Sequence, residues 1–172
     1  MAVTVVETVG GATSNSYNTV AEITTYADET VWLADWTAKT ADEKAQLAAR
    51  ATRALDSMAL SGRPASDTQA LQFPATGAYK PSGAMWATDA IPVPIKRAHA
   101  HLATWLSKFA ATEDPFTPSG ANNVKRSKLD VIETEYFASA VPEGDTFLGD
   151  IIAPQLAPWG LVSPAGTVRL TR

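Results

Sequence analysis

Cysteine is absent from this 172-residue chain. Its absence excludes disulfide bridges, iron–sulfur clusters, zinc sites with cysteine ligands and catalysis by a thiol. No apolar run approaches the roughly 20 residues that a membrane-spanning helix needs. The first residues also lack the basic region and the longer apolar stretch of a signal peptide, so we expect a soluble protein that is made in the cytosol.

Charged residues are scarce, at 19% of the sequence, and acidic side chains outnumber basic ones by 18 to 14. The net charge of −4 argues against broad binding to duplex DNA, because attraction to phosphates needs a cationic surface. Residues 1–62 and 130–172 each carry an acidic excess, whereas residues 63–129 carry a basic excess. Such blocks can form complementary faces between identical subunits, and chance segregation explains them equally well.

Proline is missing from the first 63 residues, and all 11 prolines follow. The proline-free part predicts helices, and the remainder predicts a more irregular path. Capping boxes at residues 19–22 and 40–43 predict two helices, ending near Asp28 and Leu60. Between them, residues 32–36 hold two tryptophans in a turn-like stretch. The buried stripe of the second helix is expected to contain Leu47, Ala51, Leu55 and Met58.

The middle of the chain predicts a long connection followed by a third helix. Residues 65–93 are rich in proline and glycine, and Leu71 and Phe73 are expected to anchor them in the core. Pro94 suits the first position of a helix, since its missing N–H has no intrahelical partner there. The apolar spacing extends this helix to about Ala111.

The last third predicts strands and one short helix. Residues 124–137 alternate in character, contain β-branched and aromatic side chains, and predict a β-hairpin with a basic first strand and an acidic second strand. Residues 147–156 predict a short helix, which Pro154 weakens. The tail beyond it has the alternating pattern of an arm that could add a strand to another chain.

The predicted fold class is mainly α: a small helical bundle with a β-hairpin, an extended loop and a C-terminal arm. We expect a single domain, 1–172, because a chain of this length buries enough surface to fold without disulfides or metal. Its helical core covers about 13–111, its β-hairpin about 124–137 and its C-terminal docking segment about 147–172.

Residues that usually carry catalysis are sparse. His99 and His101 lie two positions apart on the third predicted helix, so their side chains point about 200° apart and cannot hold one metal ion. Glu133 and Glu135 share one face of a predicted strand, where a solvated, salt-bridged face is favoured over acid–base catalysis. No Walker loop, dinucleotide fingerprint, His-Glu-x-x-His or Gly-x-Ser-x-Gly motif is present. We therefore expect neither an enzyme nor a bound cofactor or metal.

Two of the five tryptophans lie outside any strong helix face and are candidates for contact with a partner. For Trp86, in the long connection, burial in its own core is an equal alternative, whereas for Trp159, in the tail, an interface is favoured. Apolar and basic residues of the tail complete the set. The predicted contacts are Trp86, Trp159, Leu161, Val168, Arg169, Leu170 and Arg172.

A nucleic-acid interpretation starts from a small basic cluster, Lys125, Arg126 and Lys128, beside Tyr136 and Phe137 on the partner strand. Basic residues next to aromatic ones on a sheet can bind single strands by charge and stacking. However, the second strand also carries three acidic side chains. A hairpin whose charges pair across its strands is therefore the favoured interpretation.

The order of several short segments resembles a known family. The segments are residues 15–17 (NSY), 19–22 (TVAE), 50–52 (RAT), 62–63 (GR), 69–74 (QALQFP), 91–98 (IPVPIKRA), 124–126 (VKR) and 133–136 (ETEY). Over about residues 13–160 they are similar to tailed-phage head–tail connector (adaptor) proteins, a family often labelled "DnaT-like single-stranded-DNA-binding protein". The chain departs from the family pattern at Phe73, in a longer insert at 78–88 and in an extra tail at 159–172.

This resemblance implies a helical adaptor, of which twelve copies form a ring beneath the portal of a phage capsid. It implies that the C-terminal arm binds the portal protein, that the opposite side meets a neck or tail protein, and that DNA passes through the lumen without specific binding. The protein is then expected in the neck of the virion, after assembly in the host cytoplasm. The family label keeps single-stranded-DNA binding in phage replication as the alternative, with Lys125, Arg126 and Lys128 as contacts.

Overall fold

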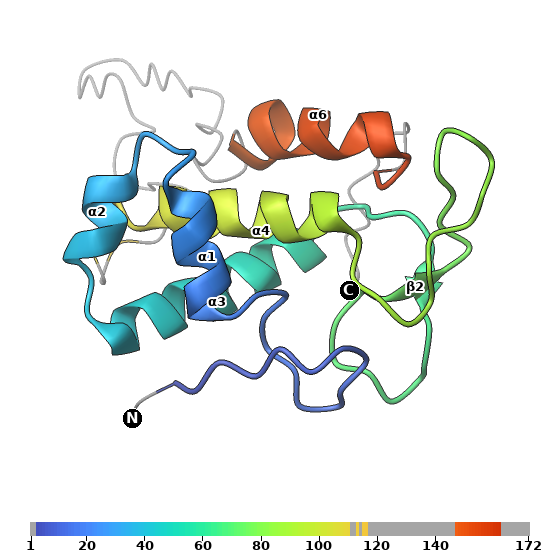
Figure 1. Ribbon diagram of the computed structural model, residues 1–172, viewed down its shortest axis with the longest axis horizontal. Coiled ribbons are helices and arrows are strands. Elements are labelled where there is room, and N and C mark those ends of the chain that lie inside the picture. Colours follow the sequence, from blue (N-terminus) through green and yellow to red (C-terminus); the bar gives the residue numbers. More distant parts are fainter. Residues whose placement is uncertain (1–2, 111–112, 114, 117–146, 163–172) are drawn as a thin grey trace, which may run out of the picture.

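The computed structural model describes residues 3–110, 113, 115–116 and 147–162. The prediction of a mainly α fold is confirmed (Figure 1). The elements, in chain order, are α1 (Val20–Ala27), α2 (Leu33–Ala38), α3 (Ala41–Asp56), β1 (Arg63–Pro64), β2 (Ala75–Thr76), α4 (Val93–Leu106), the π-helical turn η1 (Leu148–Ile152), α6 (Ala153–Leu156) and the 3₁₀ turn η2 (Ala157–Trp159).

Helix α4 is the centre of the fold. It runs between α3 and α6, and α1 packs across it (Figure 1). Because neighbours cover it on several sides, its buried residues are not confined to one stripe. The apolar spacing of this helix predicts a core-facing set that is buried throughout, namely Ile95, Ala98, Leu102, Trp105, Leu106 and, beyond its end, Phe109. The side chain of Trp105 stacks on Phe147, with 4.2 Å between ring centroids, and so ties the C-terminal segment to α4.

Both predicted capping boxes are present. Thr19 and Thr40 accept hydrogen bonds from the third residue of their helices, and the glutamates there bond back to the threonine N–H groups. Helix α3 ends at Asp56, earlier than the predicted end near Leu60, and the N–H of Ser57, its C-cap, donates to the carbonyls of Arg53 and Leu55. Helix α4 likewise ends at Leu106 rather than near residue 111.

The turn-like stretch predicted around Trp32 and Trp36 is wrong, because most of it forms α2. No side chain caps the start of this helix, so the local signal is weak. Its position follows from tertiary contacts: Trp36 is fully buried, and its indole N–H donates to Thr24 Oγ1 at 3.1 Å. The helix is therefore held by one buried side chain rather than by its own ends.

Residues 65–93 form the predicted long connection. Phe73 is buried and Leu71 is half-buried, which agrees with their predicted role as anchors. The connection also contains β2, which pairs with β1 in an antiparallel register of Arg63 with Thr76. This short pair was not predicted, and the predicted hairpin at 124–137 lies outside the described residues.

The predicted helix at 147–156 is present in altered form. Pro154 has no N–H to give to the turn before it, so a regular α-helix would lose a hydrogen bond here. The chain forms a wider π turn instead, in which the N–H of Ala153 bonds to the carbonyl of Leu148. None of the described helices combines the length and apolar character that crossing a bilayer requires.

Candidate interaction surface

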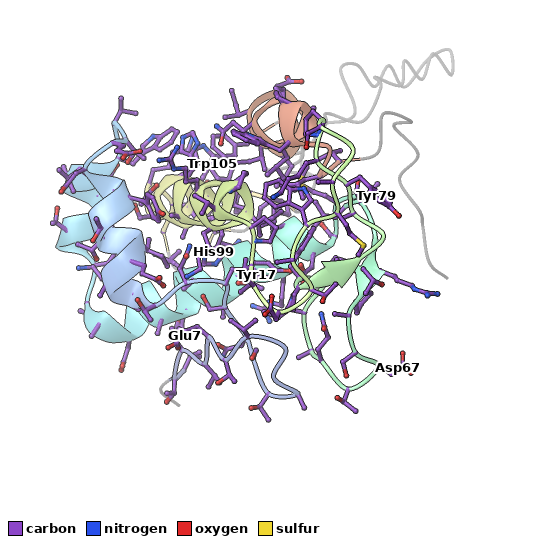
Figure 2. The ribbon with its side chains drawn as sticks, turned by 45° about the vertical axis from the view of Figure 1, so that its right-hand side comes forward. Glu7, Tyr17, Asp67, Tyr79, His99 and Trp105 are labelled. Atoms are coloured by element: carbon purple, nitrogen blue, oxygen red, sulfur yellow. The ribbon has the colours of Figure 1, made fainter. Side chains whose placement is uncertain are left out.

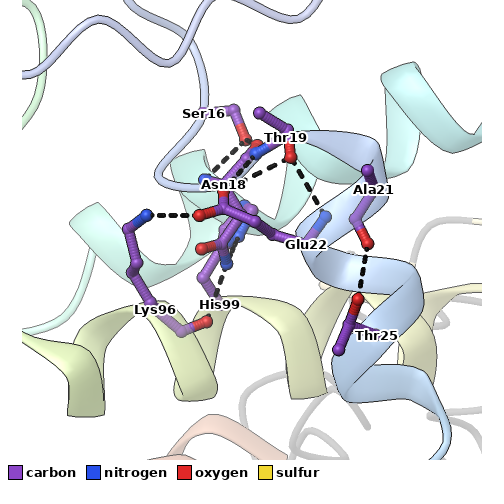
Figure 3. Close-up of polar contacts among 8 residues, drawn as sticks. All are labelled: Ser16, Asn18, Thr19, Ala21, Glu22, Thr25, Lys96 and His99. Atoms are coloured by element: carbon purple, nitrogen blue, oxygen red, sulfur yellow. Dashed lines mark hydrogen bonds and ion pairs between the residues drawn. The ribbon is translucent and has the colours of Figure 1, made fainter.

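Buried polar side chains meet where α1, α3 and α4 come together. His99 on α4 is fully buried at this point (Figure 3). Its Nε2–H donates to the carbonyl of Ala48 on α3 at 2.9 Å, and Thr52 Oγ1 lies 2.9 Å from the same nitrogen. Its Nδ1 therefore carries no proton and accepts from the side-chain amide of Asn18 at 3.0 Å.

Asn18 and its neighbours extend this cluster to the start of α1. The Asn18 amide also donates to the carbonyl of Lys96 at 2.7 Å, while its Oδ1 has no hydrogen-bond partner among the described residues. Nearby, Lys96 Nζ lies 2.7 Å from Glu22 Oε1, and Glu22 is also the capping-box residue of α1 (Figure 3). The start of α1 is thus bonded to the first turns of α4.

Tyr17 lies against this cluster and joins it to the long connection. Figure 2 shows Tyr17 close to His99, and the two rings meet edge to face at 5.9 Å between centroids. The hydroxyl of Tyr17 donates to Asp56 and accepts from the N–H of Phe73. Burial raises the pKa of Tyr17 well above its usual range, and burial also raises the pKa of Asp56, against the hydrogen bond from Tyr17.

Every group in this cluster has a structural partner that accounts for its presence, apart from the Asn18 oxygen. Burial lowers the pKa of His99 to about 4, so the ring stays neutral near pH 7 and keeps its two hydrogen bonds. His101 points elsewhere, against Trp32 and Phe147, with its Nδ1 2.8 Å from Gln155 Nε2. Among the residues that the structure describes, no group of three or more potential ligands could hold a metal ion.

A surface of a different kind forms where the long connection meets the C-terminal segment. Trp86 and Trp159, both predicted as contact residues, lie together here with 6.4 Å between their ring centroids. The indole N–H of Trp86 donates to the carbonyl of Trp159 at 3.2 Å. Lys80 Nζ lies over the Trp86 ring, 4.8 Å from its centroid. Trp86 is half-buried as a result, while 48% of Trp159 remains exposed.

Tyr79 and Met85 lie beside this pair. We call the four residues together, Tyr79, Met85, Trp86 and Trp159, the aromatic surface. Tyr79 and Met85 pair across a tight turn of the connection and are 56% and 49% exposed. Neither residue was predicted as a contact. The turn residues Pro81 and Gly83 between them are the signal that could have placed them on adjacent strands.

Gly160 fixes the end of the C-terminal segment against the connection. Its φ of +68° lies in the left-handed region, and the helix ends there. A Cβ at this position would lie against the carbonyl oxygen of Tyr79, nearer than the 3.0 Å that Cβ contacts respect. The absence of a side chain therefore allows the two segments of the aromatic surface to touch.

The remaining predicted contact residues divide into two groups. Leu161 is fully buried in the core of its own chain, so its side chain is not part of a surface that meets a partner. Its carbonyl accepts from the N–H of Ser61, and the next residue, Val162, pairs with Leu60. The other predicted residues lie outside the described part of the chain, namely Lys125, Arg126, Lys128, Val168, Arg169, Leu170 and Arg172.

A groove of about 840 Å³ lies along α3, between the N-terminal segment and the end of α4. Leu47, Leu71 and Phe109 give it an apolar lining, and Arg53 stands at its edge. Lys39 Nζ and Arg50 Nη2 reach across to the carbonyls that follow α4, at 3.4 Å from Phe109 and 3.0 Å from Glu113. No local pattern predicts this groove, because its walls come from segments that are distant in the sequence.

The whole chain, residues 1–172, matches the sequence profile of the family described as "Putative DnaT-like ssDNA binding protein". The chain belongs to this family. This family description agrees with the single-stranded-DNA-binding alternative rather than with the head–tail adaptor. Neither the curated proteins nor the solved structures contain a match.

The neutral state of His99 predicts a pH dependence of stability. Well above pH 6.5 the ring is neutral in both the folded and the unfolded chain. As the pH falls from 6.5 towards 4, the unfolded chain binds a proton that the folded chain does not, so the free energy of unfolding decreases. A pKa difference of this size corresponds to roughly 3 kcal/mol. Urea unfolding of the wild type and of His99→Gln at pH 7 and pH 4.5 should show that the variant loses less stability on acidification.

The half-buried His101 provides the matched control for this measurement. Burial lowers the pKa of His101 too, but this side chain is only partly buried. His101→Gln should therefore leave most of the pH dependence of the unfolding free energy in place. Equal pH dependence in the wild type and in His99→Gln would show that the buried ring is not the group that titrates.

The contact between Gly160 and Tyr79 predicts a second outcome. Gly160→Ala should cost the backbone strain of about 1–2 kcal/mol expected for a left-handed residue, and in addition should displace the connection from Trp159. Gly77→Ala is the matched control, because Gly77 has a φ of +74° but open space around its Cβ position. Unfolding free energies should separate the two, and tryptophan emission, to which Trp86 and Trp159 contribute among the five tryptophans, should change only in Gly160→Ala. If both variants lose equal stability with unchanged emission, the close contact has no energetic role.

Proposed function

We propose that this protein is a structural adaptor of a tailed phage. In this proposal several copies, twelve by the family resemblance, form a ring that joins the portal of the DNA-filled head to a neck or tail protein. DNA passes through the lumen of the ring without specific binding. The protein then acts in the virion neck, after assembly in the host cytoplasm, and it is not an enzyme.

The observation that carries this proposal is the aromatic surface. Tryptophan, tyrosine and methionine are the residues enriched at the centres of protein interfaces, and here they are exposed together. The hydrogen bond from Trp86 to Trp159 and the close fit at Gly160 hold them in place before any partner arrives. A surface that is already ordered loses less entropy on binding, which favours contact with a protein.

Charge supports the same interpretation. The chain has a net charge of −4, and Lys80, a cation next to the aromatic surface, already lies over the Trp86 ring. A protein that grips single strands needs a basic groove along the backbone of the nucleic acid. An acidic ring would instead let DNA pass, because phosphates are not attracted to it.

The family description favours a second candidate function, single-stranded-DNA binding in replication. The same surface gives it a physical basis, since exposed Tyr79 and Trp159 could stack on bases while Lys80 contacts a phosphate. Lys125, Arg126 and Lys128 would add the cationic part of such a site. The two candidates differ in what binds the aromatic surface, and that difference can be measured.

Trp159→Ala is expected to abolish docking to the portal while leaving the fold intact, because nearly half of this side chain is exposed. The measurement is native mass spectrometry of the protein mixed with the portal ring of its phage, in which the wild type should give one adaptor per portal subunit. Val9→Ala is the control, since Val9 is similarly exposed, at 46%, in the N-terminal segment. If Trp159→Ala docks as well as the wild type, the aromatic surface is not the site that binds the portal.

Oligonucleotide binding is expected to be weak and to change little between low and high salt. Fluorescence anisotropy with a labelled single-stranded oligonucleotide measures both quantities. Tight binding with a steep salt dependence, lost in the triple variant Lys125→Gln, Arg126→Gln, Lys128→Gln, would instead establish the DNA-binding function. Under that function, Trp159→Ala should also weaken binding, by about 1–3 kcal/mol per stacked base.

A further inference from the structure

The most exposed large apolar side chain in the described part of the chain is Val31, at 86%. It lies in the short connection between α1 and α2, and both of its neighbours are fixed. The N–H and hydroxyl of Thr30 both donate to the carbonyl of Ala27, at 2.9 and 3.0 Å, and Trp32 packs against His101 and Phe147. Val31 is therefore a rigid apolar projection rather than part of a loose loop.

Acidic side chains surround this projection. Asp28 and Glu29 precede Val31, Asp35 follows it, and all three are exposed. None of them forms an ion pair with a residue that the structure describes. We refer to residues 28–35 as the acidic knob. It consists of the ordered, apolar Val31 and the three acidic side chains around it.

The groove along α3 has the opposite character. Its floor is apolar, with Leu47, Leu71 and Phe109, and its volume of about 840 Å³ can take several side chains. Arg53, Arg50 and Lys39 line it, and Arg53 is exposed. Its two acidic residues are already engaged, since Glu43 completes the capping box of α3 and Asp56 accepts from Tyr17. An apolar group that carries negative charge at its base would complement this lining.

We propose that the acidic knob of one copy of this protein inserts into the α3 groove of the next copy. Val31 then covers the apolar floor, and the acidic residues of the knob approach Arg53. The two surfaces complement each other in shape and charge. The contact would cover Val31, the most exposed large apolar side chain of the described residues, and would fill a groove that no described part of the chain occupies.

The positions of the two surfaces make this contact heterologous. In Figure 1 the connection between α1 and α2 lies at the upper left, whereas the N-terminal segment that borders the groove lies at the bottom. Different patches therefore meet, and each copy keeps a free knob and a free groove. Contacts of this kind propagate from copy to copy and close into a ring when the rotation per step permits it. Such a contact would join neighbouring subunits of the adaptor ring, and its role in a ring rests on the proposed function.

The absence of cysteine gives a direct test. The double variant Val31→Cys, Gln46→Cys carries one thiol on the knob and one on the groove. Under mild oxidation at increasing protein concentration, it should form a ladder of covalent multimers on a non-reducing gel. Each single variant should give no more than dimers. Val31→Cys, Thr88→Cys is the matched control, because Thr88 is exposed but lies outside the groove.

Charge reversal tests the electrostatic part separately. In the double-cysteine background, Arg53→Glu or Glu29→Arg alone should lower the yield of multimers about tenfold, as like charges then face each other, and the combination should restore it. A ladder that is unaffected by the single reversals would refute the charge pairing. Absence of any ladder up to the solubility limit, or an equal ladder from the Thr88 control, would overturn the proposal as a whole.

The cross-linking results can be interpreted independently of the native mass spectrometry with the portal ring. Multimers without portal docking would keep the contact between copies and remove the adaptor role. Docking of the portal to a protein that gives no ladder would keep the adaptor role and remove the contact proposed here.

Discussion

The described fold depends on the hydrogen bonds of the buried His99 imidazole. One ring nitrogen donates to the backbone of α3 and the other accepts from Asn18, which precedes α1, so a single side chain of α4 fixes two other helices. The two ring nitrogens can make these opposite bonds only while the ring is neutral. Burial secures that state, and the bonds in turn make burial tolerable. Specific hydrogen bonding, rather than apolar packing alone, therefore sets the relation between the helices.

The N-terminal part of the family resemblance falls largely on this region. The segments at 15–17 and 19–22 supply Tyr17 and Glu22, and the segment at 91–98 supplies Lys96, whose side chain pairs with Glu22. In the structure these positions bond to one another or to the His99 cluster rather than forming a surface. A match to the family at these positions is therefore evidence of a shared fold. Function has to be sought where the chain is exposed.

How much of this could be predicted from sequence depends on the range of the interaction. The capping boxes and the buried face of α4 were predictable, because they follow from residues three or four positions apart. Helix α2 was not, since its start has no cap and its place is set by the burial of Trp36. Trp86 and Trp159 were each recognised as candidates, but not their contact, which joins residues far apart in the chain. The burial of Leu161 was not predictable either, because it also depends on residues far away in the chain.

The pairing of Val162 with Leu60 has a mechanical consequence. The backbone of Leu161 is bonded to Ser61, so residues 161–162 run alongside the segment that leaves α3. A force applied beyond Val162 would first meet these backbone bonds and pass into α3, one of the helices packed on the core. The C-terminal turns would be shielded from that load. The route by which tension enters the molecule thus bypasses the aromatic surface, which can keep its shape while the end of the chain is under strain.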